Sequence, residues 1–329
     1  MSSPSVAASP RVLVTGASGF IGRCLLPALS ERGYDCRGTV RTQSATRAAA
    51  AASLHAVGDI GPTTDWTRAL EGVSVVVHLA GRAHVLHETA SDPAAEFMRV
   101  NAQGTAALAA AARAAGVRRF IYISSIGVLG LESGDRPFSA ASTPHPHSPY
   151  TRSKLEGEIA ARSFANASFD VIVLRPPLVY GAGARANVLR LLRWVDRAWP
   201  LPLGAVRNRR SLVSVWNLCD LIRQLLDNPA AAGGTWLVSD GEDLSTPDLV
   251  RRLGAAMGRR VRLLPVPVKA LEFLGHVTGR QAQITQLCGS LTIDMAATRE
   301  QLRWSPPLTV TESLTRTVAW YLAADGHAG

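Results

Sequence analysis

The sequence is poor in cysteine and contains no long apolar run. Its four cysteines, Cys24, Cys36, Cys219 and Cys288, lie far apart without a CxxC pair, which argues against a zinc site and against a disulfide framework. No apolar stretch approaches the roughly 18 to 20 residues that a transmembrane helix needs, and the N-terminus lacks the segments of a signal peptide. We therefore expect a cytoplasmic protein with reduced cysteines, no metal site and no insertion into a membrane.

Acidic residues are also in the minority, with 25 Asp and Glu against 35 Lys and Arg and a formal net charge of +10. Net charge informs about partners and not about fold. The basic residues are mostly arginines scattered through an alanine-rich chain, without the block of like charge that is typical of a nucleic-acid-binding tail. We expect no nucleic-acid partner. At 329 residues and 47% hydrophobic content, the chain can bury a full core in one large or two small domains.

Short apolar segments alternate with helical patterns through the first half of the chain. Strands are predicted at 11–15, 36–40, 73–80, 118–124 and 170–175. Helices are predicted at 20–32, 45–53, 64–71, 93–115 and 150–165. Continuous Val and Ile runs are typical of buried parallel strands, and the alternation indicates βαβ crossovers. The sequence therefore predicts an α/β fold with a doubly wound parallel (Rossmann) sheet, whose ligand crevice lies at the carboxyl ends of the strands.

The pattern loosens after about residue 178 into short strands and helices separated by Pro-rich turns. We expect a dinucleotide-binding Rossmann domain over 10–178, to which later segments at about 211–240 return. A smaller mixed α/β region is expected over 179–323. Residues 1–9 and 324–329 are expected to be flexible tails.

The first predicted strand runs directly into VTGASGFIGR, in which Gly16, Gly19 and Gly22 have a G-x-x-G-x-x-G spacing. Glycines on a strand-to-helix turn let the backbone approach a pyrophosphate, and the N-terminus of the helix supplies unpaired N–H groups. A tight turn packed for its own sake is the alternative. The order of strand, glycines and helix favours dinucleotide binding.

The end of the second predicted strand indicates which dinucleotide to expect. An acid there would bind a ribose 2′-hydroxyl, whereas a base would accept a 2′-phosphate. Arg41 follows the strand directly, and GTVRTQSATR contains no Asp or Glu. Because guanidinium pairs well with phosphate, the sequence favours NADP(H), with NAD(H) as the alternative. Asp59 in VGDI is a candidate for the adenine amino group or an ordinary turn residue.

Tyr150 and Lys154 lie four residues apart and so share one face of a predicted helix. That helix begins in the loop after strand 118–124, so we expect both side chains to point toward the crevice. An ammonium and a positive nicotinamide ring nearby would lower the pKa of the phenol from about 10 and allow proton exchange near neutral pH. Ser125, at the end of the same strand, is placed to donate a hydrogen bond to that oxygen. The sequence thus predicts a catalytic triad of Ser125, Tyr150 and Lys154.

Seven motifs together resemble those of the extended short-chain dehydrogenase/reductases, which include the UDP-glucose 4-epimerase-like nucleotide-sugar enzymes. They are VTGASGFIG (14–22), VVHLAGRAH (76–84), VNAQGT (100–105), YISSIGVLG (122–130), YTRSK (150–154), LRPPLVYG (174–181) and LRWSPP (302–307). The resemblance spans nearly the whole chain. It implies that the triad acts on a sugar hydroxyl or ketone while hydride passes to or from the nicotinamide, and that Lys154 also holds the nicotinamide ribose.

The same resemblance implies the binding residues. Besides Arg41 and Asp59, the expected cofactor-binding positions are Gly16, Ser18, Gly19, Phe20, Ile21, Gly22, Ile60, Leu79, Ala80, Gly81, Asn101, Tyr150, Lys154 and Pro177. Region 179–323 would mainly bind a UDP-sugar, and the expected substrate-binding residues are Arg82, Ser125, Asn187, Arg210 and Arg280. Arg210 stands directly before SLVSV, where such enzymes keep a diphosphate-binding arginine. A homodimer is expected because the predicted helices 93–115 and 150–165 resemble the family's dimer interface.

Departures from the family pattern narrow the expected reaction. Ile126 and Gly127 stand where sugar 4,6-dehydratases carry an Asp-Glu pair, so dehydration is not expected. Leu129 replaces a common aromatic residue, and the C-terminal diphosphate-binding arginine has no clear match other than Arg280. Both departures weaken the case for an ordinary UDP-glucose 4-epimerase.

Together with Arg41, these departures favour an NAD(P)H-dependent 4-keto reductase. The nearest resemblance is to bacterial enzymes of surface-polysaccharide (O-antigen) synthesis that reduce UDP-4-keto-6-deoxy-N-acetylglucosamine to UDP-N-acetylquinovosamine. One alternative is a 4-epimerase of UDP-glucose or UDP-N-acetylglucosamine with tightly bound NAD. Another is a non-catalytic dinucleotide-binding subunit, which the intact Tyr150 and Lys154 disfavour.

Overall fold

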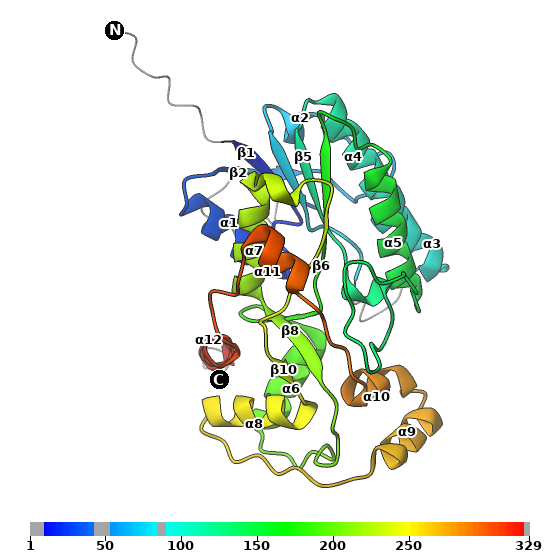
Figure 1. Cartoon of the computed structure of the whole chain (residues 1–329), viewed down its shortest axis with the longest axis vertical. Helices are drawn as coiled ribbons and strands as arrows, with labels where there is room; N and C mark the ends of the chain where they lie inside the picture. Colours follow the sequence, from blue (N-terminus) through cyan, green and yellow to red (C-terminus); the bar gives the residue numbers. More distant parts are fainter. Residues whose placement is uncertain (1–9, 43–52, 84–89, 326–329) are drawn as a thin grey trace. The chain divides into compact units, whose positions relative to one another are not determined.

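The computed structural model describes residues 10–42, 53–83 and 90–325 of the chain, which form two compact units (Figure 1). Unit 1 combines Met1–Ser125, Ser148–Leu174 and Ile222–Thr235. Unit 2 combines Ile126–His147, Arg175–Leu221 and Trp236–Gly329. The division proposed from the sequence, with a Rossmann domain over 10–178 and a return at about 211–240, stays a prediction.

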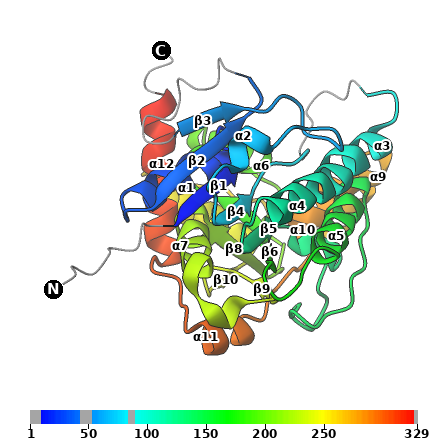
Figure 2. The same ribbon diagram turned by 90° about the horizontal axis from the view of Figure 1, so that it is seen from above.

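A seven-stranded sheet runs in the order β3-β2-β1-β4-β5-β6-β9 (Figure 2). Its strands are β1 (Arg11–Thr15), β2 (Asp35–Val40), β3 (Ser53–Ala56), β4 (Val75–His78), β5 (Arg119–Ile123), β6 (Asp170–Arg175) and β9 (Thr235–Leu237). All neighbours from β3 to β6 pair in parallel. The strand order reverses between β1 and β4, and doubly wound sheets bind their ligands at this switch point. The predicted fold class is confirmed.

Helices cover both faces of this sheet, with α4 and α5 along one face and α1 along the other (Figure 2). The helical elements of unit 1 are α1 (Phe20–Ser30), α2 (Thr67–Leu70), α3 (Pro93–Met98), η2 (Arg99–Gln103), α4 (Gly104–Ala114), α5 (Pro149–Arg162) and η4 (Pro229–Ala231). Phe120 and Phe169 are completely or almost completely buried in the core between the sheet and α4. A capping box formed by Ser148 and Thr151, with Pro149 in the first turn, fixes where α5 begins.

Three helix predictions differ from the structure. The single helix predicted over 93–115 is interrupted by a π-helical turn, η2, between α3 and α4. The helix predicted over 64–71 shortens to one turn, α2. The helix predicted over 45–53 lies outside the described residues except for Ser53, which begins β3.

Unit 2 is built around a small mixed sheet in which β8 (Arg210–Ser214) pairs in parallel with β7 (Leu178–Tyr180) and antiparallel with β10 (Asp243–Leu244). Its helical elements are η3 (Ile126–Val128), α6 (Ala186–Asp196), the first half of α7 (Val215–Asp227), α8 (Thr246–Ala256), α9 (Val268–Val277), α10 (Gln281–Cys288), α11 (Ala296–Leu302) and α12 (Val310–Asp325). A separate apolar core joins α6, α8 and α12 through Leu192, Val250 and Leu314. The smaller mixed α/β region is thus confirmed.

Helix α12 continues through Asp325, so the first two residues of the predicted tail 324–329 are helical and the others lie outside the described residues. The predicted tail 1–9 lies outside them as well. None of the helices in the described ranges has the length and apolar character needed to cross a membrane. All four cysteines are free thiols.

Candidate active site

The turn between β1 and α1 forms a narrow backbone cradle. Gly16 has a φ of +69°, which favours glycine, and a Cβ there would lie 3.0 Å from the backbone nitrogen of Ala80. A Cβ at Gly22 would lie 2.4 Å from the carbonyl oxygen of Gly16. Helix α1 begins after Gly19 without a side-chain cap and without an acidic residue in its first turn. Uncapped N–H groups beside a glycine turn fit the pyrophosphate of a dinucleotide.

Most of the other predicted cofactor-binding residues follow the carboxyl ends of neighbouring strands. They are Ser18, Phe20 and Ile21 after β1, Arg41 after β2, Asp59 and Ile60 after β3, and Leu79, Ala80 and Gly81 after β4. These strand ends belong to one edge of the sheet, where the fold class binds its ligand. Pro177 follows β6 and is buried in unit 2.

Arg41 and Asp59 form an ion pair that the sequence did not predict. The Nε atom of Arg41 lies 2.9 Å from Oδ1 of Asp59, and the side chains are 78% and 69% exposed. The pair joins two residues that the sequence assigned to different parts of the adenosine. The carboxylate also offsets the positive charge that Arg41 would present to a 2′-phosphate, and this weakens the argument for NADP.

Lys154 is one of the most deeply placed charged side chains of unit 1, at 5% exposure. Its Nζ atom lies 4.1 Å from the ring centroid of Tyr122, and a Cβ at Gly81 would lie 3.9 Å from Nζ and 2.9 Å from Oδ1 of Asn101. Burial lowers the pKa of Lys154 to about 7, while the nearby Glu158 carboxylate acts in the opposite direction. The amine therefore changes charge close to neutral pH.

Tyr150 stands in the first turn of α5, and Ser125 donates a side-chain hydrogen bond to it. Burial raises the pKa of Tyr150, and the Ser125 hydrogen bond only partly opposes this. In the protein alone the loss of hydration outweighs the hydrogen bond. The lowered pKa expected from the sequence requires a bound nicotinamide and stays a prediction. The Tyr150 ring also meets the edge of Phe97, over which the guanidinium of Arg82 lies 5.4 Å from the centroid.

The π-helical turn aims Asn101 at the loop after β4. The Nδ2 atom of Asn101 donates to Arg82 O at 3.0 Å and to Ser153 Oγ at 2.9 Å, while Oδ1 accepts from Arg82 N at 2.7 Å. Ser153 in turn donates to the carbonyl oxygen of Tyr150 at 2.8 Å. One amide thereby fixes the loop to the helix that carries Tyr150. Ser153 was not predicted, although it stands inside YTRSK.

A second buried network centres on His78, which sequence reasoning did not single out. Thr105 Oγ1 donates to Asn101 O at 2.7 Å and so accepts from His78 Nε2 at 3.0 Å. His78 Nδ1 then accepts from Thr15 Oγ1 at 2.7 Å, and Thr15 Oγ1 accepts from Ala80 N at 3.1 Å. Burial and the charge of Lys154 lower the pKa of His78 to about 3, so the ring is neutral. The ring links the ends of β1 and β4 to the turn that carries Asn101. The sequence signal that could have identified His78 is a polar residue in the otherwise apolar strand β4.

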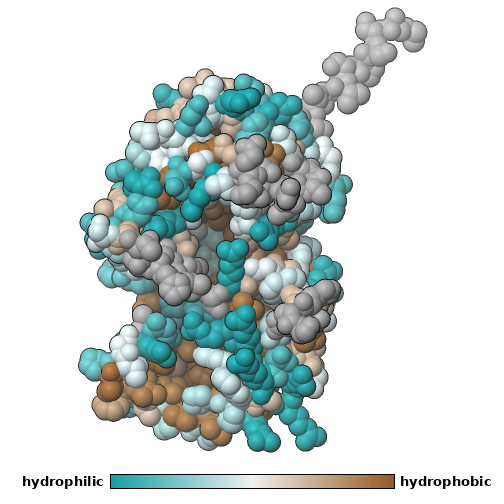
Figure 3. Space-filling model, turned by 180° about the vertical axis from the view of Figure 1, so that it is seen from behind, coloured by the Kyte–Doolittle hydropathy of each residue, from teal (hydrophilic) through white to brown (hydrophobic). Residues whose placement is uncertain are grey.

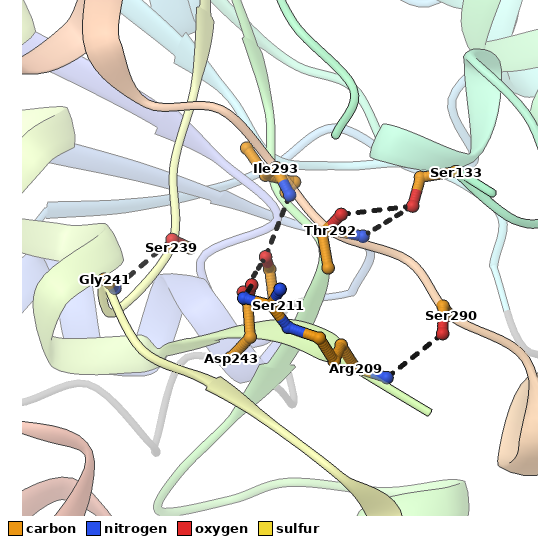
Figure 4. Close-up of polar contacts among 9 residues, drawn as sticks. All are labelled: Ser133, Arg209, Ser211, Ser239, Gly241, Asp243, Ser290, Thr292 and Ile293. Carbon is orange, nitrogen blue, oxygen red and sulfur yellow. Dashed lines mark hydrogen bonds and ion pairs between the residues drawn. The ribbon is translucent and has the colours of Figure 1, made fainter. Parts of the chain in front are cut away.

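The predicted diphosphate-binding arginine, Arg210, is the first residue of β8, and its Nη1 atom donates to Gly289 O at 3.0 Å. Its neighbour Arg209 pairs instead with Asp243 at 3.1 Å. Figure 4 shows how Ser211 also donates to Asp243 and accepts from the backbone of segment 290–293. Arg209 is therefore already neutralised, whereas no ion pair of Arg210 is present among the described residues.

The other two predicted substrate-binding residues also lie in unit 2. Asn187 stands in the first turn of α6, with its amide 3.4 Å from Gln286 Oε1. Arg280 is exposed at the position before α10. Both stay predictions for the substrate site.

The fold is thus that of a dinucleotide-binding Rossmann protein with a Tyr and a Lys on one helix beside the glycine turn. Residues 12–239 match the NAD dependent epimerase/dehydratase family, and the chain belongs to this family. It is therefore an NAD-dependent enzyme of the nucleotide-sugar epimerase/dehydratase class.

Two relatives and one solved structure cover almost the whole chain. A UDP-glucose 4-epimerase of Vibrio cholerae is 38% identical over 96% of this chain and 97% of its own length. An N-acetyl-alpha-D-glucosaminyl-diphospho-ditrans,octacis-undecaprenol 4-epimerase of Escherichia coli O157:H7 is 26% identical over 94% of each chain. The structure of MoeE5 in complex with UDP-glucose and NAD has a TM-score of 0.74 at 25% identity, over 95% of this chain and 99% of that one. The relatives favour a 4-epimerase over the 4-keto reductase that the sequence analysis preferred.

Proposed function

We propose that the protein is a 4-epimerase of UDP-linked sugars that uses Ser125, Tyr150 and Lys154. The observation that carries this proposal is the Ser125 hydrogen bond to Tyr150, one helical turn from a buried Lys154. The 38% identity to a UDP-glucose 4-epimerase supports the same reaction. NAD is the expected cofactor.

The side chains are suited to moving one proton at the sugar O4. Tyr150 would accept the O4 proton on its phenol oxygen and later return it, while Ser125 holds that oxygen in place by its hydrogen bond. A charged Lys154 would stabilise the phenolate. NAD, when bound, would supply the hydride-transfer chemistry at C4 that epimerisation requires. Asn101 and His78 would act as positioning residues, because each reaches the site only through other groups.

The residues present fit that cofactor. The Gly16–Gly22 cradle suits the pyrophosphate, and hydrogen bonds from the Asn101 side chain to the Arg82 backbone fix the loop 79–82. Lys154 would hold the nicotinamide ribose. In unit 2, Arg210 is the proposed partner of the sugar-nucleotide diphosphate, since among the described residues its guanidinium donates to the backbone oxygen of Gly289 and forms no ion pair.

A 4-keto reductase is the second candidate, favoured by Arg41 directly after β2, in the segment GTVRTQSATR (38–47), which contains no Asp or Glu. That arrangement suits NADP. The ion pair between Arg41 and Asp59 weakens this argument, because the carboxylate offsets the charge that a 2′-phosphate would meet. The role in surface-polysaccharide synthesis and the homodimer stay predictions of the sequence analysis.

The test compares both reactions with one protein preparation. With UDP-glucose or UDP-N-acetylglucosamine and no added reductant, a 4-epimerase produces the C4 epimer, which ion-exchange chromatography and proton NMR resolve. Tyr150→Phe should abolish this conversion while NAD released on denaturation stays near the wild-type amount. Oxidation of NADPH by UDP-4-keto-6-deoxy-N-acetylglucosamine, without epimerisation of either UDP-sugar, would replace the 4-epimerase by the 4-reductase. The lipid-linked substrate of the Escherichia coli relative should be included as a third substrate.

A further inference from the structure

Helix α9 of unit 2 carries an apolar stripe that faces solvent. Ala270, Phe273, Leu274 and Val277 follow the i, i+3, i+4, i+7 spacing that places residues on one helix face. Phe273, Leu274 and Val277 are 71%, 55% and 66% exposed. Figure 3 shows hydrophobic surface gathered at the end of unit 2 where α9 and α10 lie. A contiguous apolar stripe of this kind marks an interaction surface more often than scattered single residues do.

The exposed stripe is not the face that holds α9 in place. Leu271 and Gly275 form the buried face, and a Cβ at Gly275 would lie 2.7 Å from Cγ1 of Ile284 on α10. Leu271 belongs to the core of unit 2. The helix therefore packs against unit 2 through one face, and the apolar side chains of its other face remain exposed and could contact another surface.

The stretch of sequence that leads into α9 and contains it is strongly basic. Segment 259–280 contains Arg259, Arg260, Arg262, Lys269 and Arg280 but a single acid, Glu272. Arg259 is paired with Asp196, whereas the other four cations are exposed and make no ion pair among the described residues. Lys269 and His276 lie on the polar arc of α9 beside Phe273. An apolar stripe with a cationic margin is the pattern of helices that lie in the headgroup region of a membrane.

We propose that α9 and its basic margin dock unit 2 onto the surface of an anionic lipid bilayer. The ten-residue helix, about 15 Å long, would lie parallel to the surface and bury Phe273, Leu274 and Val277 at the level of the headgroups. The cations would add attraction to anionic lipids. This peripheral contact requires no spanning helix and does not depend on the proposed 4-epimerase activity.

Charge decides against a second copy of the chain as the occupant. In a two-fold symmetric dimer the same patch faces itself. Lys269 and His276, which flank Phe273 on α9, would then be brought close to their own copies, with Glu272 as the one acid of segment 259–280 to offset them. An anionic lipid surface complements the patch instead.

The experiment is vesicle flotation of the purified full chain at low and high salt. Vesicles of equal parts phosphatidylglycerol and phosphatidylcholine should carry the protein, pure phosphatidylcholine should bind at least about tenfold less, and salt should release it. The double variant Phe273→Ser/Leu274→Ser should lose roughly tenfold or more of its partitioning. Arg260→Gln/Arg262→Gln should lose binding mainly at low salt.

The matched control is Leu322→Ser, which removes another exposed apolar side chain of unit 2, 44% exposed and on α12. This variant should float like the wild type. Equal flotation of the Phe273/Leu274 variant and the wild type would overturn the proposal, and so would no flotation of the wild type. A dimer in light scattering that the same double variant converts to monomer would assign the face to a second copy. Turnover of soluble UDP-sugars should be unchanged in these variants, so a failed flotation and a failed 4-epimerase assay are distinguishable.

Discussion

Replacing the buried lysine of the site should make the protein more stable while it stops the reaction. Burial lowers the pKa of Lys154 from 10.5 to about 7. Each pKa unit corresponds to about 1.4 kcal/mol, so the charged amine costs the folded state about 5 kcal/mol. Lys154→Met has a similar size without the charge and should recover much of this free energy. The loss of activity follows because the cation beside Tyr150 is removed.

The gain in stability should depend on pH in a defined direction. The unfolded chain holds the Lys154 proton up to its ordinary pKa, whereas the folded protein releases it near pH 7. Between these values the unfolded state binds more protons, so the stability of the wild type rises with pH. The advantage of Lys154→Met should therefore fall from about 5 kcal/mol at pH 6 to about 2 kcal/mol at pH 9.

Urea unfolding at pH 6, 7.5 and 9, followed by circular dichroism, measures this difference. The chain contains two lysines, and Lys269→Met on the exposed surface of α9 is the matched control, which should follow the wild-type profile. Lysine labelled with 13C at Cε should give two NMR signals, one of which titrates near pH 7. Parallel stability profiles of wild type and Lys154→Met, or no titration between pH 6 and 8, would refute the reasoning.

Three further substitutions test the surroundings of the site. His78→Gln keeps hydrogen-bonding atoms but cannot titrate; because burial lowers the His78 pKa to about 3, the wild type should lose about 3 kcal/mol more stability than the variant between pH 6 and pH 4, measured by urea unfolding. Gly81→Ala places a Cβ 2.9 Å from Asn101 Oδ1, so the affinity for NAD should fall at least roughly tenfold in calorimetry, and an unchanged Kd would contradict the proposed cradle. Arg41→Ala should weaken NADPH about tenfold relative to NADH if Arg41 binds the 2′-phosphate; an unchanged ratio would leave its ion pair with Asp59 as its role.

The parts of the fold that could be predicted are those set by local pattern. The continuous apolar strands and the helices between them indicated the parallel sheet, because both faces of such strands are buried. The glycine turn and the positions of Ser125, Tyr150 and Lys154 followed from the same order of elements. Their partners did not, since His78 meets Thr15 and Thr105 across 63 and 27 residues of sequence. The π-helical turn was missed because the alanine-rich segment after it, GTAALAAAARA, has few large apolar side chains that would reveal a one-residue shift of the helical pattern.

The ionisation of Tyr150 that the sequence analysis expected includes the effect of a bound nicotinamide, and this requirement bears on the mechanism. A cation one turn from the phenol favours a low pKa. Burial of both groups instead favours their neutral forms, since it raises the pKa of Tyr150 and lowers that of Lys154 to about 7.

In the protein alone, the proton acceptor of the proposed reaction is therefore not yet present at neutral pH. A positive charge brought into the same low-dielectric site favours the phenolate strongly, because Coulomb attraction is large where water is excluded. Oxidised nicotinamide carries such a charge and reduced nicotinamide does not. Burial of Tyr150 and Lys154 would thus couple proton acceptance to the oxidised cofactor, which is the form that an epimerase needs when it removes the hydride from C4.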